Sequence, residues 1–196
     1  LPGSRLKAVF FTHERIEDHA FWPGRFEQRV LRFPKPMLVR PYWDEHVLPG
    51  AIENDVETFD LYFSPLSVVP ARLKLPSVAT VHDLAFLRFP KVLPWKYRFY
   101  WRRVTKRSAE YATRLIAVSE STRRDLAAFY PGSERKTKVV HEAPDPLYWK
   151  PPGGKVEMPE RFRGLGRYFL AVGTLEPRKN YPFLLRVMQQ LSLIHI

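Results

Sequence analysis

Two adjacent cations, Arg178 and Lys179, follow an apolar run that ends at Gly173 and precede a new apolar pattern. A glycine after a buried strand lets the backbone approach a ligand closely. The amide groups at the start of the next helix then point at that ligand, with the positive end of the helix dipole behind them. The spacing therefore predicts a diphosphate site. Because only one glycine is present, a solvated pair of cations on an ordinary loop remains the alternative.

A second candidate is the end of "SVATVHDL" (77–84), an apolar and β-branched run that closes with His82 and Asp83. In open α/β sheets, ligands bind at the carboxyl ends of the strands. A histidine at such an end can act in a site, or it can be a hydrogen-bonded residue at the rim of the sheet.

Ser119 and Glu120 follow the apolar run "RLIAVS" in the same way. They could line a cleft, but Ser119 also suits the N-cap of the next helix. His141 and Glu142 lie where the chain leaves this region, and we interpret them as structural. No spacing of potential ligands predicts a metal site.

These candidates need an open sheet to position them, and the second half of the chain predicts one. Apolar strands alternate with segments of helical periodicity, which indicates parallel βαβ units of the α/β class. Strands are expected at 60–65, 77–84, 114–119, 138–146 and 168–172, and more loosely around 6–11 and 37–40; helices are expected at 94–111, from Ser119 or Ser121 to 129, and from 181.

The segment 150–167 is rich in proline, glycine and charge, which predicts a linker. It divides the chain into a first domain, 1–149, and the start of a second, 168–196.

Composition restricts the class of protein. The chain of 196 residues has no cysteine, which excludes a disulfide framework and a thiolate metal site. It has no run of 18 apolar residues, so no transmembrane helix is expected. Its net charge of +12 leaves nucleic acid, an anionic membrane and phosphorylated small molecules as candidate partners.

Much of this charge lies in "KVLPWKYRFYWRRVTKR" (91–107), which has no acid. At helical spacing the aromatic side is expected to pack on the sheet. The cations expected to face outward are Arg98, Arg102, Arg103, Lys106 and Arg107. Such a face can be solvated surface, or it can dock on an anionic bilayer. Binding of single-stranded nucleic acid is a third interpretation, although no nucleic-acid motif is present.

Three stretches resemble glycosyltransferase family 4. "YFLAVGTLEPRKNYPFLLRVM" (168–188) is similar to the start of the family's C-terminal domain, the glycosyltransferase group 1 domain. "DLYFSPLSVVPARLKLPSVATVHDLAFLRFP" (60–90) resembles the N-domain segment whose strand ends in His-Asp, and "RLIAVSESTRRDLAAFYPGSERKTKVVHEAPDP" (114–146) resembles the strand–helix–strand run that follows. The resemblance implies a GT-B fold, in which two Rossmann-like domains face each other across the active site.

The resemblance also implies roles for individual residues. Arg178 and Lys179 would bind the donor diphosphate and stabilise charge on the leaving group, with Gly173 allowing close approach. Thr174 stands where many members have an arginine for one phosphate contact. His82 matches the family's active-site histidine beside the donor sugar, and Asp83 is expected to fix its loop.

The implied activity is that of a retaining glycosyltransferase, which moves a hexose such as mannose from a nucleotide sugar to a glycan or lipid-linked acceptor. No metal, other cofactor or nucleic-acid partner is expected. The enzyme would be bacterial and cytoplasmic, with peripheral contact at the inner face of an anionic membrane. The alternative is a basic domain that binds nucleic acid or a phosphate sugar without transferring it.

Both ends are expected to be incomplete relative to that family. Its first strand with a glycine-rich loop is not recognisable here, and its pair of glutamates would lie beyond residue 196. The tail "LSLIHI" (191–196) breaks the helical pattern and resembles a translated sequencing adapter, so it is expected to be non-native. The chain as written is expected to be inactive.

Overall fold

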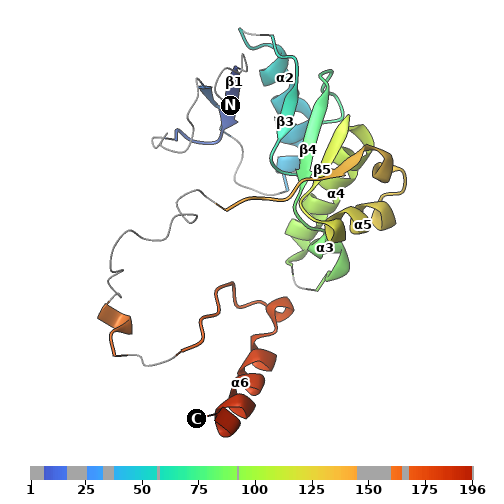
Figure 1. Ribbon diagram of the computed structural model, residues 1–196. Helices are drawn as coiled ribbons and strands as arrows, with labels where there is room; N and C mark the ends of the chain where they lie inside the picture. Colours follow the sequence, from blue (N-terminus) through green and yellow to red (C-terminus); the bar gives the residue numbers. More distant parts are fainter. Residues whose placement is uncertain are drawn as a thin grey trace.

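The computed structural model describes residues 7–16, 26–32, 38–56, 58–91, 93–144, 160–164 and 168–195. Its centre is a four-stranded parallel sheet in the order β3-β4-β5-β6 (Figure 1). The strands are β3 (Tyr62–Ser64), β4 (Ser77–Val81), β5 (Arg114–Ala117) and β6 (Thr137–Val139). Each strand pairs in parallel with the next. The predicted α/β class with parallel βαβ units is confirmed, although the strands are shorter than the apolar runs that predicted them.

Helices connect these strands and cover the sheet. After β4 come the short α3 (Ala85–Arg88) and the long α4 (Trp95–Tyr111), and α5 (Glu120–Phe129) joins β5 to β6 by way of a 3-10 turn at Ser133–Lys136. The main core lies between sheet and helices, where Val81, Leu115 and Leu126 are almost fully buried. This packing holds the carboxyl ends of β4, β5 and β6 at one edge of the sheet.

The N-terminal part forms a smaller unit. Strands β1 (Ala8–Thr12) and β2 (Phe26–Val30) pair in parallel, and α1 (Arg40–Tyr42), a π-helix (Trp43–Val47) and α2 (Leu48–Glu53) follow. The prediction of a strand at 37–40 is wrong for residues 38–40, the part that the structure describes. Residues 38–39 form a turn, and Arg40 begins a helix with Pro41 at its start. Leu48 and Ile52, four residues apart, bury the inner side of α2 against Trp43.

The C-terminal part departs from the prediction. Residues 168–172 do not form the expected strand, and Phe169 and Val172 are 80% and 87% exposed. A strand needs a hydrogen-bonded neighbour, and no described strand lies beside this segment. The predicted loop contains a 3-10 turn at Pro177–Lys179. The predicted helix is α6 (Tyr181–His195), whose backbone continues through 191–195, where a break in the pattern was expected.

The predicted linker lies mostly outside the described residues. Within 150–167 the structure describes only 160–164, where Glu160–Phe162 form one 3-10 turn. The division of the chain into two domains at this segment stays a prediction.

Candidate functional site

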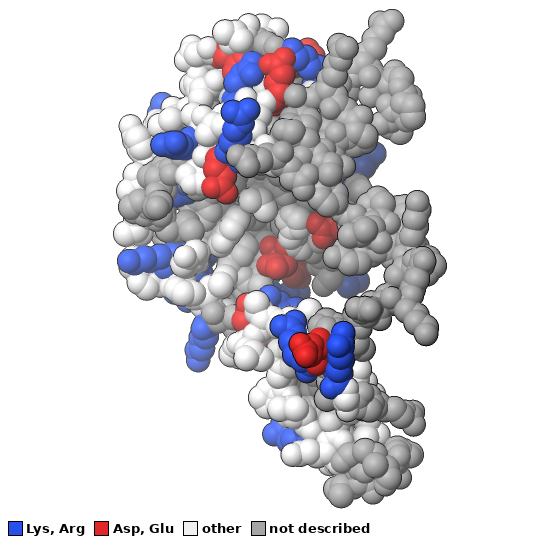
Figure 2. Space-filling model, turned by 90° about the vertical axis from the view of Figure 1, so that its left-hand side faces the viewer, with Lys and Arg blue, Asp and Glu red and all other residues white. Residues whose placement is uncertain are grey.

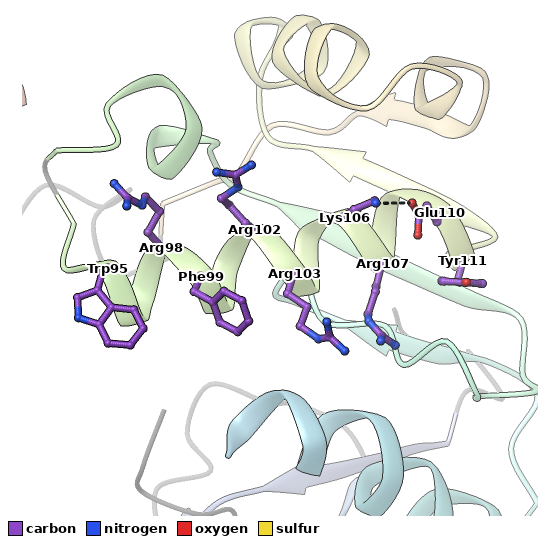
Figure 3. A pocket seen from close by; sticks show the side chains of 9 residues that line it. All are labelled: Trp95, Arg98, Phe99, Arg102, Arg103, Lys106, Arg107, Glu110 and Tyr111. Atoms are coloured by element: carbon purple, nitrogen blue, oxygen red, sulfur yellow. Dashed lines mark ion pairs between the residues drawn. The ribbon is translucent and has the colours of Figure 1, made fainter. Parts of the chain in front are cut away.

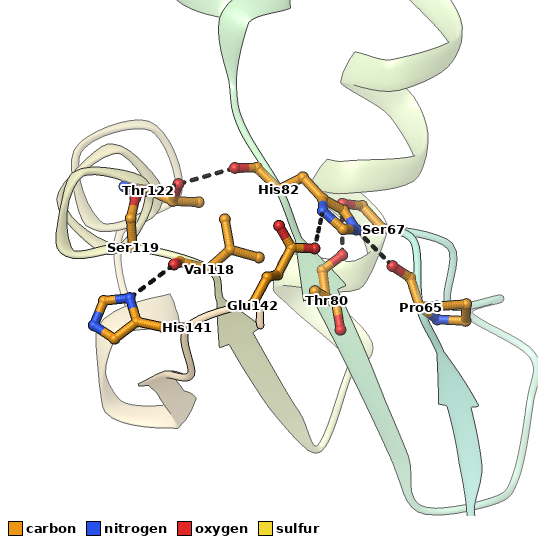
Figure 4. Close-up of polar contacts among 9 residues, drawn as sticks. All are labelled: Pro65, Ser67, Thr80, His82, Val118, Ser119, Thr122, His141 and Glu142. Carbon is orange, nitrogen blue, oxygen red and sulfur yellow. Dashed lines mark hydrogen bonds and ion pairs between the residues drawn. The ribbon is translucent and has the colours of Figure 1, made fainter. Parts of the chain in front are cut away.

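The carboxyl edge of the sheet brings together His82, which follows β4, and Glu142, which follows β6 (Figure 4). His82 Nδ1 lies 3.0 Å from Glu142 Oε1, and His82 Nε2 lies 2.8 Å from the carbonyl oxygen of Pro65. Both ring nitrogens therefore face an acceptor. Only the imidazolium form can donate from both nitrogens at once, so this geometry suits a positively charged ring.

Glu142 is the residue that sequence reasoning missed. It was interpreted as structural, yet it contacts the ring of the candidate active-site histidine. The sequence did hold a signal for this contact. Glu142 follows β6 and His82 follows β4, and the carboxyl ends of parallel strands meet at one edge of the sheet. The neighbouring His141 does have a structural contact, since its Nδ1 lies 3.2 Å from the carbonyl oxygen of Val118.

The backbone of His82 is held by the start of α5. Thr122 Oγ1 donates to the His82 carbonyl oxygen over 3.0 Å, and Ser119 Oγ accepts from the Thr122 amide over 3.1 Å. Ser119 is thus the N-cap of α5, as the second of its two interpretations from the sequence has it. Glu120 pairs with Arg123 at 2.8 Å on the surface of the same helix. These contacts fix the position of His82 relative to the edge.

Asp83 fixes the loop that follows His82. Its Oδ1 accepts a hydrogen bond of 2.9 Å from the amide of Ala85, the first residue of α3. This contact agrees with the expected loop-fixing role of Asp83.

The loop 173–179 is a compact cluster of polar groups. Arg178 Nε donates to Glu176 Oε2 over 2.6 Å, and Thr174 Oγ1 donates to Glu176 Oε1 over 2.9 Å. These two hydrogen bonds lower the pKa of Glu176. Among the described residues Lys179 has no hydrogen-bonding or ion-pair partner through its side chain.

Gly173 is the point of close approach in this loop. A Cβ atom at Gly173 would lie 2.7 Å from the hydroxyl of Tyr181, so a larger residue would push the start of α6 or the tyrosine ring away. The structure does not bring this loop to His82, since residues 168–195 lie apart from the four-stranded sheet in Figure 1.

The basic segment forms α4, but the sets of buried and exposed side chains differ from the predicted ones. Tyr100 and Trp101 pack inward, whereas Trp95, Tyr97 and Phe99 are exposed. Of the five cations expected to face outward, Arg102, Arg103 and Lys106 are exposed, whereas Arg98 is half-buried and its Nη1 donates to the carbonyl oxygen of Pro90 over 2.8 Å. Arg107 does not face solvent freely, because it pairs with the buried Glu45 at 2.5 Å. The difference arises because a second packed element, the π-helix with Glu45, covers one flank of α4.

The described residues contain no group of three or more histidine, aspartate or glutamate side chains placed to hold a metal ion. None of the described helices has the length and apolar character needed to cross a membrane.

Comparison with known proteins places the chain in a family. The family model of Glycosyltransferase Family 4 matches residues 7–146, which is more than half of the chain and includes His82, Ser119 and Glu142. Neither a curated protein nor a solved structure matches it. With its parallel α/β sheet and the polar groups at the carboxyl edge, the chain belongs to glycosyltransferase family 4.

Proposed function

We propose that this protein is the donor- and acceptor-binding part of a retaining glycosyltransferase. Such an enzyme takes a hexose such as mannose from a nucleotide sugar and transfers it to a glycan or lipid-linked acceptor without a metal ion. The observation that supports this most directly is the placement of His82, whose ring lies at the carboxyl edge of the sheet between Glu142 and Pro65. A fixed, partly exposed histidine ring can stabilise negative charge that develops on a reacting sugar phosphate.

The loop 173–179 would receive the donor diphosphate. Lys179 is the cation better placed to do so, since among the described residues its ammonium group makes no hydrogen bond or ion pair and only its charge acts on Glu176. Arg178 is held by Glu176 and would have to exchange that carboxylate for a phosphate oxygen. An arginine fork binds a phosphate as well as a carboxylate, so the exchange conserves its hydrogen bonds.

The decisive variant is Lys179→Ala. We expect it to weaken binding of UDP or GDP by about 1.5–3 kcal/mol, the usual worth of a hydrogen bond to a charged group. Isothermal titration calorimetry with each nucleotide measures this loss. Glu176→Gln should act in the opposite direction, because it frees Arg178 for the phosphate.

The matched control is Arg186→Ala, which removes an exposed cation from α6 outside the loop. Equal losses for Lys179→Ala and Arg186→Ala would show that nucleotide binding reflects general charge and would remove Lys179 from the site. Binding of oligonucleotides together with no binding of UDP or GDP would instead favour the alternative, a basic domain that binds nucleic acid.

The outward side of α4 would hold the enzyme at the inner face of an anionic membrane. Arg98, Arg102 and Lys106 recur every four residues, and they point to the same side of the helix in Figure 3. Each cation near such a surface contributes about 1 kcal/mol. The site of action would then be cytoplasmic and next to lipid-linked acceptors.

A further inference from the structure

A second row of side chains follows the other flank of α4. Trp95, Phe99, Arg103, Arg107 and Tyr111 recur every four residues, so each lies next to the following one along a stripe that winds slowly around the helix. In Figure 3 the first four of these side chains point to the same side, away from Arg98, Arg102 and Lys106. We call these five residues the aromatic–arginine row.

The aromatic–arginine row lies in a groove. Together with Arg98, Arg102, Lys106 and Glu110 of the same helix, it lines a hollow of about 620 Å³, which shares Phe99, Arg103 and Arg107 with a neighbouring hollow of about 340 Å³. The second hollow adds a facing wall, made by Tyr42, His46 and Arg72 among others. The shared residues join the two hollows into one elongated depression beside α4.

The two walls of this groove are fastened together beneath it. Tyr100 donates a hydrogen bond of 2.9 Å to the buried Asp44, and Arg40 Nε donates to the other oxygen of the same carboxylate over 3.0 Å. Arg107 pairs with Glu45, the neighbour of Asp44. The groove is therefore built into the fold, because buried contacts fix the helix on each side of it.

The groove carries a net positive charge. Arg107 is neutralised by Glu45, but Arg72 and Arg103 form no ion pair with any described residue. Both are exposed and line the same hollow, and His46 lies beside them, stacked on Tyr42 with ring centroids 4.5 Å apart. Glu45 and Glu110 also line the hollows, but the lining cations outnumber them. Guanidinium groups bind carboxylate or phosphate groups through planar pairs of donors.

We propose that this groove binds an anionic glycan chain, as a site separate from the transfer site at the carboxyl edge. Neighbouring rings of the row, such as Trp95 and Phe99, are about 6 Å apart along the helix axis, since each residue of a helix rises about 1.5 Å. Flat aromatic faces at that interval can stack on successive sugar rings, while Arg103 and Arg72 pair with acidic groups of the chain. The choice of a glycan rests on the proposed function, which makes sugar chains the acceptors.

The shape of the site favours this occupant over a bilayer. The smaller hollow has two facing walls and can hold a chain between them, whereas a flat bilayer cannot enter it. Arg98, Arg102 and Lys106 line only the larger hollow, whose lining residues all belong to α4. None of the residues that line either hollow belongs to the His82–Glu142 group. The groove would thus hold a growing acceptor chain away from the point of transfer.

The test is binding of hexagalacturonate, an oligosaccharide with one carboxylate per sugar, to the whole chain without any donor present. We expect Arg103→Gln to raise the dissociation constant about tenfold, since it removes a charge-assisted contact. Phe99→Ala should raise the dissociation constant about two- to tenfold, because it removes the stacking contact. Neutral maltohexaose should bind more weakly than hexagalacturonate.

The matched controls are Tyr97→Ala, an exposed aromatic of α4 that lines neither hollow, and Arg124→Gln, an exposed cation of α5. They should leave the dissociation constant unchanged. Absence of hexagalacturonate binding, or equal losses in the controls, would overturn the proposal. So would a result in which Phe99→Ala and Arg103→Gln weaken binding to phosphatidylglycerol vesicles or oligothymidylate but not to the glycan. Because no donor is used, failure here leaves the nucleotide result for Lys179 unaffected.

Discussion

His82 is held at three points by three different elements. The start of α5 binds its carbonyl oxygen, the loop after β3 contacts Nε2, and the segment after β6 contacts Nδ1. The contact with Glu142 is the one that a ligand could most easily replace, because the carboxylate side chain is 63% exposed. We therefore expect Glu142 to act as a positioning residue for the ring of His82.

Replacing Glu142 by glutamine should loosen the ring of His82 and leave the fold intact. An exposed pair of this kind contributes about 0.2–1 kcal/mol, so we expect the free energy of unfolding to fall by no more than that. The ¹⁵N shifts of the imidazole nitrogens, which report the ring nitrogens that carry protons, should change for His82 alone.

The control for this prediction is Glu120→Gln, which removes another exposed carboxylate at the same edge. Glu120 pairs with Arg123 and does not touch His82, so its loss should leave the ring shifts of His82 unchanged. Identical spectra for wild type and Glu142→Gln would show that the contact is absent in solution.

At the scale of single residues, the sequence could predict which strand ends carry polar groups but not how these groups pair. His82 and Ser119 were found because each follows an apolar run directly. Glu142 was missed because its partner is 60 residues away in the chain, and only the sheet order places the two together. Arg107 was assigned to the surface because Glu45 comes from a π-helix that no periodicity predicted.

At the scale of elements, one hydrogen bond ties the last turn of α4 to the loop between β3 and β4. Ser108 is fully buried, and its Oγ accepts from the amide of Val69 over 2.9 Å. This loop leads into β4 and so helps to position His82 at the other end of that strand.

We expect Ser108→Ala to lower the free energy of unfolding by about 1–3 kcal/mol, because it leaves the buried amide of Val69 without an acceptor. Urea denaturation measures the change. Ser121→Ala, at an exposed position in the first turn of α5, should cost less than about 0.5 kcal/mol. Equal losses in the free energy of unfolding for Ser108→Ala and Ser121→Ala would mean that a water molecule accepts the hydrogen bond from the Val69 amide in place of Ser108.

Elements with their own periodicity were predictable, and elements that depend on a distant partner were not. The boundaries of α4 and α5 agree with the sequence because apolar spacing and the cap at Ser119 are local signals. Residues 168–172 are as apolar as β5, yet no described strand pairs with them. β2 was missed because "FEQRV" is mostly polar, and its pairing with β1 defines it as a strand.

At the scale of the whole molecule, the charge of +12 opposes folding, since a compact chain brings like charges together. Raising sodium chloride from about 20 to about 300 mM shortens the Debye length and should increase the free energy of unfolding by about 1 kcal/mol. Urea denaturation at pH 7 measures this without adding further salt.

Arg124→Glu lowers the net charge by two at an exposed site, so it should reduce the salt dependence. A free energy that falls with salt would show that ion pairs such as Arg107–Glu45 outweigh the general repulsion. The positive charge of the groove and of Arg98, Arg102 and Lys106 would then be offset by neighbouring acids. The electric field that could attract an anionic partner would be weaker as a result.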